Sequence, residues 1–134
     1  MPHRMEWIEE PWLLQVDYIG TITEEDAEKV LQKCLEYAEK HPINFLVNLT
    51  ESNGFSPSVV KTKTGMKVLR HPNVKWWGYV GIRGIFQMGT KIFMRFVPFK
   101  AFNTVEEARA FLLEMVQHQK DDAAKTAAQP QAPA

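Results

Sequence analysis

The spacing of apolar residues predicts strands and amphipathic helices in alternation along the chain. The run 43–49 is apolar at nearly every position, as in a parallel strand that is covered on both faces of a sheet. Residues 12–20 instead alternate, which predicts one more strongly buried face, and with residues 3–8 they predict an antiparallel hairpin. Further strands are expected at 74–83 and 99–102. We therefore expect 43–49 to be the central strand.

Four helices are predicted between and after these strands. The first begins at Thr23, which has the spacing of a capping box, and the second begins at Ser56, which is followed by a proline. The third covers residues 84–97, and the last begins near Thr104. This order predicts an α/β fold: a mixed, mostly parallel five-stranded sheet with an N-terminal antiparallel hairpin and four helices.

The length of 134 residues fits a single domain. We expect this domain to cover residues 1–120 and to be followed by a disordered tail at 121–134, which lacks large apolar side chains. The chain shows no charged-then-apolar leader, and no apolar run approaches the roughly 18 residues of a membrane span. The single cysteine, Cys34, lies on the apolar stripe of the first helix and is interpreted as a core residue. We therefore expect a cytoplasmic protein from a reducing compartment.

Charge is segregated along the chain although the formal net charge is zero. Residues 52–105 contain nine basic side chains and no acidic one, whereas the rest of the chain carries all 16 acidic residues. This segregation predicts an anion-attracting surface, unless the acidic segments fold beside the basic ones and cancel the field; the sequence leaves both outcomes open. The candidate anion-binding residues are Lys63, Lys67, Arg70, Arg83, Lys91 and Arg95.

No catalytic grouping, metal-binding cluster or cofactor motif is recognisable in the sequence. His41 and His71 each follow a predicted helix, where the helix dipole favours a histidine. We therefore expect neither enzymatic activity nor a cofactor; an enzyme stays open as a third alternative if the fold brings histidine and carboxylate side chains together in a cleft. Because open α/β sheets bind their ligands at the carboxyl ends of strands, the site is expected in the loop after the central strand. Its candidate residues are Asn48, Ser52, Asn53, Ser56 and Ser58.

The segment Gly81-Ile82-Arg83-Gly84 has the spacing of the G-x-x-G loop that clamps a nucleic-acid backbone. That loop joins two helices, whereas this segment leaves a predicted strand. The spacing of Gly78, Gly81 and Gly84 also fails the dinucleotide-binding pattern. We therefore expect no sequence-specific nucleic-acid partner.

In the order of its elements and in four short segments, the chain resembles the SpoIIAA-like proteins, relatives of the STAS domain. The segments are residues 12–20, Thr23-Glu24-Glu25-Asp26, Leu46-Val47-Asn48-Leu49 and Phe102-Asn103-Thr104-Val105-Glu106-Glu107-Ala108. The resemblance extends to about residue 118. It implies a β-α superhelix and a bacterial protein family that is mostly uncharacterised.

In anti-sigma-factor antagonists of the STAS type, an aspartate ends the central strand and an Asp-Ser-Ser-Gly motif with a phosphorylatable serine opens the next helix. Here Asn48 stands at the acid position and the helix opens Phe55-Ser56-Pro57-Ser58, so the motif is absent. The resemblance implies a non-enzymatic regulatory domain that presents this loop and helix to a protein partner. Ser56 and Ser58 are either phosphate acceptors or ordinary helix-start residues. The alternative function is binding of an anionic small molecule or lipid head group through the basic segment 61–100.

The sequence also predicts self-association. The first strand contains Met5, Trp7 and Ile8, and with the wide apolar arc at 84–97 this is more apolar surface than one small core readily covers. A homodimer would bury it, unless the first and last helices cover it within one chain. The candidate residues for the dimer seam are Phe86, Phe93 and Val97.

Overall fold

The computed structural model describes the backbone of residues 3–53, 63–81 and 99–128, and side chains within these ranges up to residue 126. The predicted third helix at 84–97 lies outside these residues, as does the predicted helix start at Ser56. The site and seam residues that fall outside them are Ser56, Ser58, Arg83, Phe86, Lys91, Phe93, Arg95 and Val97.

Five strands form one mixed sheet in the order β1-β2-β3-β4-β5. Strand β1 (His3–Glu9) pairs antiparallel with β2 (Leu13–Gly20), which confirms the predicted hairpin. Strands β3 (Ile43–Ser52), β4 (Val74–Val80) and β5 (Phe99–Phe102) follow in parallel. The predicted mixed, mostly parallel sheet with a central apolar strand is therefore confirmed.

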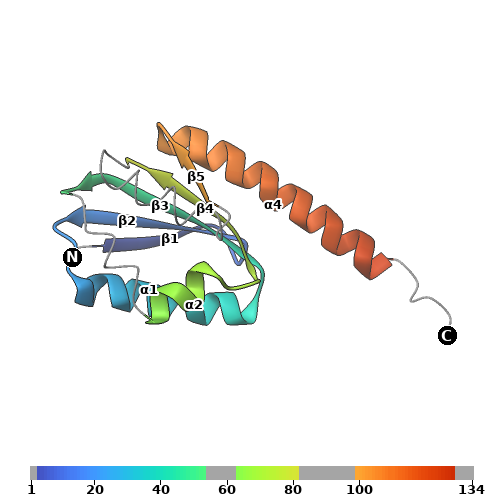
Figure 1. Cartoon of the computed structure of the whole chain (residues 1–134). Coiled ribbons are helices and arrows are strands. Elements are labelled where there is room, and N and C mark those ends of the chain that lie inside the picture. Colours follow the sequence, from blue (N-terminus) through green and yellow to red (C-terminus); the bar gives the residue numbers. More distant parts are fainter. Residues whose placement is uncertain (1–2, 54–62, 82–98, 129–134) are drawn as a thin grey trace.

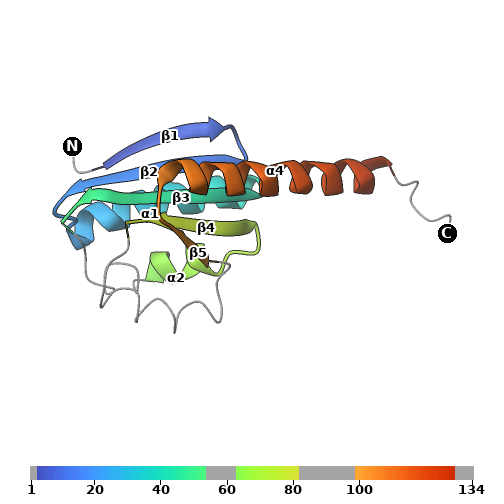
Figure 2. The ribbon, with the colours of Figure 1, turned by 90° about the horizontal axis from the view of Figure 1, so that it is seen from above.

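The described residues contain three helices, α1 (Glu24–Lys40), α2 (Lys63–Leu69) and α4 (Val105–Ala128). As predicted, Thr23 caps α1: its Oγ1 accepts a hydrogen bond from the Asp26 backbone N–H at 3.1 Å. Figure 1 shows α1 and α2 side by side on one face of the sheet and α4 on the other. The fold therefore has three layers, and strands β2 to β4 lie in the middle one (Figure 2).

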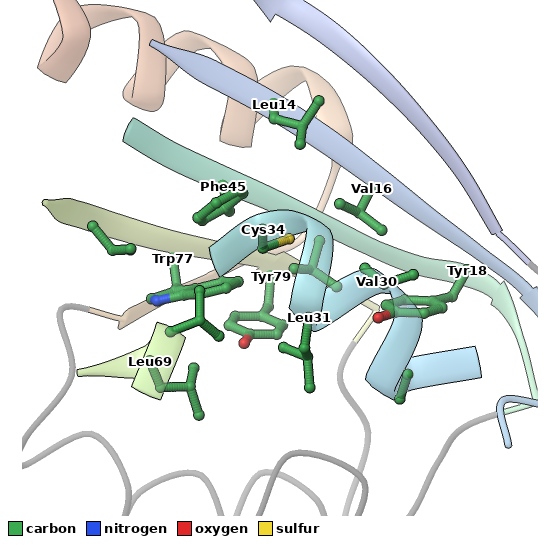
Figure 3. Close-up of a cluster of buried hydrophobic side chains, with 14 of the residues drawn as sticks. Leu14, Val16, Tyr18, Val30, Leu31, Cys34, Phe45, Leu69, Trp77 and Tyr79 are labelled. Atoms are coloured by element: carbon green, nitrogen blue, oxygen red, sulfur yellow. The ribbon is translucent and has the colours of Figure 1, made fainter. Parts of the chain in front are cut away.

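The larger apolar core lies between the sheet and the helix pair α1 and α2. Alternate residues of β2, β3 and β4 point toward α1, and Figure 3 shows how their side chains meet those of the helix. Phe45 is fully buried, and its ring stacks on that of Trp77 with centroids 4.6 Å apart. Trp77 and Trp76 lie on opposite faces of the sheet, as successive residues of a strand do, and Trp76 packs in the cluster beneath α4.

The smaller core lies beneath α4 and joins Ala108, Leu112 and Val116 of the helix to the sheet. Gly78 of β4 permits this close packing, because a Cβ atom there would lie 2.9 Å from Leu112 Cδ1. These three helix residues are therefore the buried face of α4.

The prediction of one more strongly buried face on β2 was wrong. Every residue from Leu13 to Tyr18 is buried, including Gln15 and Asp17. The reason is that helices cover both faces of the sheet, so the polar face of this strand is buried under α4. The alternation in the sequence shows which side chains of β2 are polar, whereas the tertiary structure determines which of them are exposed to solvent.

The sequence left two ways to cover the apolar residues of the first strand, a homodimer or the first and last helices of the same chain. Met5, Trp7 and Ile8 are partly buried and pack against the two cores. The Trp7 ring meets that of Tyr37 of α1 edge-on, with centroids 5.1 Å apart. The first and last helices therefore cover the apolar side chains of β1 within one chain.

Helix α4 runs eight residues past the predicted end of the domain, to Ala128. The prediction of a disordered tail was therefore wrong for residues 121–128, and residues 129–134 lie outside the described part. Alanine and lysine are good helix formers, and adding residues to an existing helix avoids the cost of nucleation. Both views show the end of α4 projecting beyond the sheet, and residues 121–126 are exposed. None of the helices in the described ranges, α4 included, is long and apolar enough to cross a bilayer.

Candidate functional site

The carboxyl ends of β2, β3 and β4 lie at one end of the sheet, because these strands are parallel. The chain leaves β3 there and continues into residues 54–62. Of the predicted site residues, Asn48, Ser52 and Asn53 lie at this end, whereas Ser56 and Ser58 fall outside the described ranges.

Asn48 is half-buried and orders the last part of β3. Its Oδ1 accepts hydrogen bonds from the Thr50 backbone N–H at 3.1 Å and from Thr50 Oγ1 at 2.7 Å. Its Nδ2 donates to Asp17 Oδ1 at 2.9 Å. The amide group of Asn48 therefore uses both of its ends, one within its own strand and the other toward β2.

Asp17 of β2 is the centre of this arrangement and is only 3% exposed. Its Oδ1 also accepts a hydrogen bond from Gln15 Nε2 at 2.8 Å. Its Oδ2 accepts one from Arg4 Nε of β1 at 3.2 Å, which is also an ion pair. A buried carboxylate is costly unless it is paired and hydrogen-bonded, and these three donors satisfy that requirement.

The network continues to α4 through Arg109. Its Nε donates to Gln15 Oε1 at 2.9 Å, and its Nη2 lies 4.0 Å from Glu6 Oε2 of β1. Side chains from three strands and one helix are thus linked around Asp17. We define the Asp17 network as Arg4, Glu6, Gln15, Asp17, Asn48, Thr50 and Arg109.

Sequence reasoning found only Asn48 of this network. The strand register could have pointed to Asp17, because Asp17 stands directly opposite Asn48 in the parallel pair of β2 and β3. Two polar residues that face each other on adjacent buried strands indicate a buried hydrogen bond. Arg4 and Arg109 come from distant parts of the sequence, so only the packing of β1 and α4 reveals them.

The start of the loop is tied to the turn after β2. The backbone N–H of Asn53 donates to Gly20 O at 2.8 Å, and its Nδ2 donates to Thr21 Oγ1 at 3.2 Å. Ser52 Oγ donates to Leu49 O at 2.8 Å. These bonds set the direction in which the chain leaves the sheet.

Gly81 brings the end of β4 against the end of β3. Its φ of +86° favours glycine, and a Cβ atom would lie 2.9 Å from the Thr50 backbone nitrogen. The glycine spacing that matched no ligand-binding motif therefore has a packing reason at this position. The backbones of β3 and β4 are therefore closely packed at this end of the sheet.

The described candidate anion-binding residues, Lys63, Lys67 and Arg70, are exposed on or directly after α2. The acidic first turn of α1, with Glu24 and Glu25, belongs to the helix packed beside α2. Lys100 lies beneath α4 on the opposite face, with its Nζ 4.3 Å from the centroid of the Phe111 ring. Among the described residues, the basic segment is therefore divided between two faces.

Cys34 is a core residue, as predicted, and is 1% exposed. Burial raises the pKa of its thiol to about 12, which keeps it protonated and unreactive near neutral pH. Burial likewise raises the pKa of Tyr18 and of Tyr79. A cavity of about 20 Å³ lies beside these three residues, which is room for about one water molecule.

Three comparisons with known proteins bear on this arrangement. A family model described as SpoIIAA-like matches residues 13–113. Among solved structures, an uncharacterized protein of the DUF3478 family with a SpoIIAA-like fold, from Shewanella loihica PV-4, is similar at 22% identity and a TM-score of 0.58, covering 82% of this chain and 91% of that chain. The anti-sigma factor antagonist SpoIIAA in its unphosphorylated form is similar at 13% identity and a TM-score of 0.58, covering 84% of this chain and 97% of that one. A comparison with curated proteins returned no match.

Proposed function

This chain belongs to the SpoIIAA-like family, and from that premise we propose that it is a non-enzymatic regulatory domain that binds a protein partner. The binding surface is the carboxyl end of the sheet together with the loop and helix that follow β3. One structural neighbour is an anti-sigma factor antagonist, which is a protein that acts through other proteins. The likeness at 13% identity supports the fold alone, so the function is argued from the site.

The observation that carries the proposal is the Asp17 network at the base of the loop. Asn48 is hydrogen-bonded to both Asp17 and Thr50. These bonds fix the end of β3, from which the loop begins. The polar groups of the network form hydrogen bonds with one another. This arrangement suits a role in holding the loop in place rather than a role in catalysis. A loop that starts from such a base loses less conformational entropy when a partner binds it.

The experiment is affinity capture from a lysate of the source organism, followed by calorimetry with the purified partner. Glu51 is exposed at the carboxyl end of β3, and Glu39 is exposed near the end of α1, at the opposite end of the sheet. We expect Glu51→Arg to weaken the interaction and the matched control Glu39→Arg to leave it unchanged. Equal effects of the two variants, or no partner at all, would contradict the proposal.

Regulation by phosphorylation of Ser56 or Ser58 is a separate part of the proposal. Both serines precede Lys63, and a phosphate adds about −1.5 to −2 charges at neutral pH. We expect the double variant Ser56→Asp, Ser58→Asp to change the affinity for the captured partner, with the double alanine variant as control. If all three proteins bind alike, the serines do not control binding, and the interaction surface itself is unaffected by that result.

A second candidate function is weak binding of an anionic lipid head group or small molecule. It is favoured by the exposure of Lys63, Lys67 and Arg70 near one another in sequence. Each basic residue near an anionic bilayer contributes about 1 kcal/mol, so three give weak, salt-dependent binding.

Flotation with anionic vesicles tests this function at low and at high salt. The double variant Lys63→Gln, Lys67→Gln should lose any binding, whereas Lys29→Gln, Lys125→Gln removes the same charge from other exposed sites. Absence of anionic-vesicle binding by the wild type at low salt would exclude the lipid. Absence of phosphate binding by the wild type, measured by calorimetry with inorganic phosphate, would exclude the small anion.

A further inference from the structure

Strand β1 is one edge of the sheet, and in the described part of the chain no strand pairs with its outer side. A strand edge offers backbone donors and acceptors to another strand, and natural proteins usually protect such edges. β1 is seven residues long, from His3 to Glu9, and Figure 2 shows it at the margin of the sheet. We infer that β1 pairs antiparallel with β1 of a second copy, centred on Met5, so that two sheets become one continuous sheet.

The charges of Arg4 and Glu6 select the register of this β1–β1 pairing. With Met5 opposite Met5 of the second copy, Arg4 stands opposite Glu6 and Glu6 opposite Arg4. A register centred on Arg4 or on Glu6 would place two like charges directly opposite each other. Opposite-charge pairs across antiparallel strands stabilise pairing, and like charges destabilise it. Only the register centred on Met5 therefore uses both charged residues favourably.

The side chains of Arg4 and Glu6 are available for these contacts. They are 64% and 59% exposed, and both lie on the α4 face of the sheet. Arg4 uses its Nε for Asp17, and the two Nη groups point to no partner that the described residues supply. In the dimer, Asp17, Arg4, the second copy's Glu6 and the second copy's Arg109 would form a row of alternating charges, and two-fold symmetry would generate this row twice.

The opposite face of the same register brings His3 against Trp7 of the second copy. His3 Nδ1 is buried without a hydrogen-bond partner in the described residues. An open hollow of about 490 Å³ lies beside it, lined by His3, Arg4, Met5 and Ile19. A neighbouring strand along this edge would partly fill that hollow. Arg4 and Glu6 also belong to the Asp17 network, but the pairing uses the outer edge of β1, and its tests measure self-association rather than capture of a different protein.

The first test is the mass of the full chain by light scattering across a dilution series. We expect a concentration-dependent dimer, since a short strand pairing buries little surface and gives a weak complex. Glu6→Lys places like charges opposite each other twice and should raise the dissociation constant roughly tenfold or more. Glu10→Lys is the matched control, because Glu10 is exposed in the turn after β1 and outside the pairing. Circular dichroism checks that both variants keep the fold.

The second test traps the register by cysteine cross-linking. In the Met5-centred register, the two Met5 positions face each other at about 4.5–5.5 Å between Cα atoms, within reach of a disulfide. The two Glu6 positions are then diagonal neighbours, about 7–8 Å apart and out of reach. We expect Met5→Cys to cross-link under mild oxidation and Glu6→Cys not to do so. The native Cys34 is buried and does not interfere.

Several results would overturn the inference. A mass of one chain at every concentration excludes the dimer. Equal cross-linking of the two cysteine variants excludes the register. Loss of the dimer in Phe93→Glu, combined with full retention in Glu6→Lys, would move the seam to the apolar helix flank predicted from sequence.

Discussion

Asn48 of β3 and Asp17 of β2 stand directly opposite each other in a parallel strand pair, and their side chains are joined by a hydrogen bond of 2.9 Å from Nδ2 to Oδ1. This contact links the predicted loop residue to a buried carboxylate that the sequence did not reveal as important. It also connects the loop after β3 to β1 and α4, because Asp17 and its neighbour Gln15 bind the two arginines of the network.

Replacing Asn48 with alanine should lower the free energy of unfolding by about 1–3 kcal/mol. The variant removes one donor to buried Asp17 and leaves the Thr50 N–H and hydroxyl without their acceptor. Urea denaturation measures the change. Asn53→Ala is the matched control, because Asn53 is exposed and should cost within about 0.5 kcal/mol. Equal losses in the two variants would argue that the network contributes little.

Replacing Gly81 with alanine should destabilise the protein more than replacing Gly20. Both glycines have positive φ, +86° and +70°, so both variants carry a similar conformational cost of about 1 kcal/mol. Only at Gly81 does a Cβ atom also meet neighbouring backbone, 2.9 Å from the Thr50 nitrogen; at Gly20 nothing lies within 4 Å. The difference between the two melting curves therefore measures the close approach of β4 to β3. A larger loss for Gly20→Ala would contradict this packing.

Replacing Leu112 with alanine should cost about 2–4 kcal/mol, because the side chain is 1% exposed in the core beneath α4. The adjacent Leu113 is 39% exposed, and Leu113→Ala should cost less than about 1 kcal/mol. Chemical denaturation of the two variants compares residues of one type on one helix. Similar costs would mean that α4 does not dock on the sheet through this face in solution.

Stability should decrease as the pH rises above about 9. The thiol of Cys34 has an ordinary pKa of 9.0, and burial raises it to about 12 in the folded protein. Between these values the unfolded chain has lost the proton and the folded chain keeps it, so the unfolded state binds fewer protons and is favoured by rising pH. One such group changes the free energy by about 1.4 kcal/mol per pH unit. Tyr18 and Tyr79 act in the same direction above their ordinary value of 10.0.

Urea titrations at pH 8, 9 and 10 measure this loss. Cys34→Ala should show a shallower decrease between pH 9 and 10, since it removes the thiol and the tyrosines act mainly above pH 10. A stability that is constant or rises over this range would contradict the buried state of these groups.

Local sequence pattern was enough to determine the type and order of the elements that the structure describes. The continuous apolar run of β3 indicates a strand covered on both faces, and it is the middle strand of the sheet. Thr23 and Asp26 form the predicted start of α1, because capping depends on residues three positions apart. The position proposed for the site, after β3, follows from the same order of elements, because parallel strands end at a common edge.

Exposure and long-range pairing were decided only by the tertiary structure. Asp17 and Gln15 have polar side chains, and it is the docking of α4 over the sheet that buries them and supplies Arg109 as a partner. Helix α4 continues beyond residue 121 because local helix propensity, rather than a core, determines its end. A single sequence gives the polarity of each residue and of its near neighbours, but the hydrogen bonds of the Asp17 network join residues up to 94 positions apart, as Gln15 and Arg109 show. Such contacts depend on how the layers pack, which local periodicity does not encode.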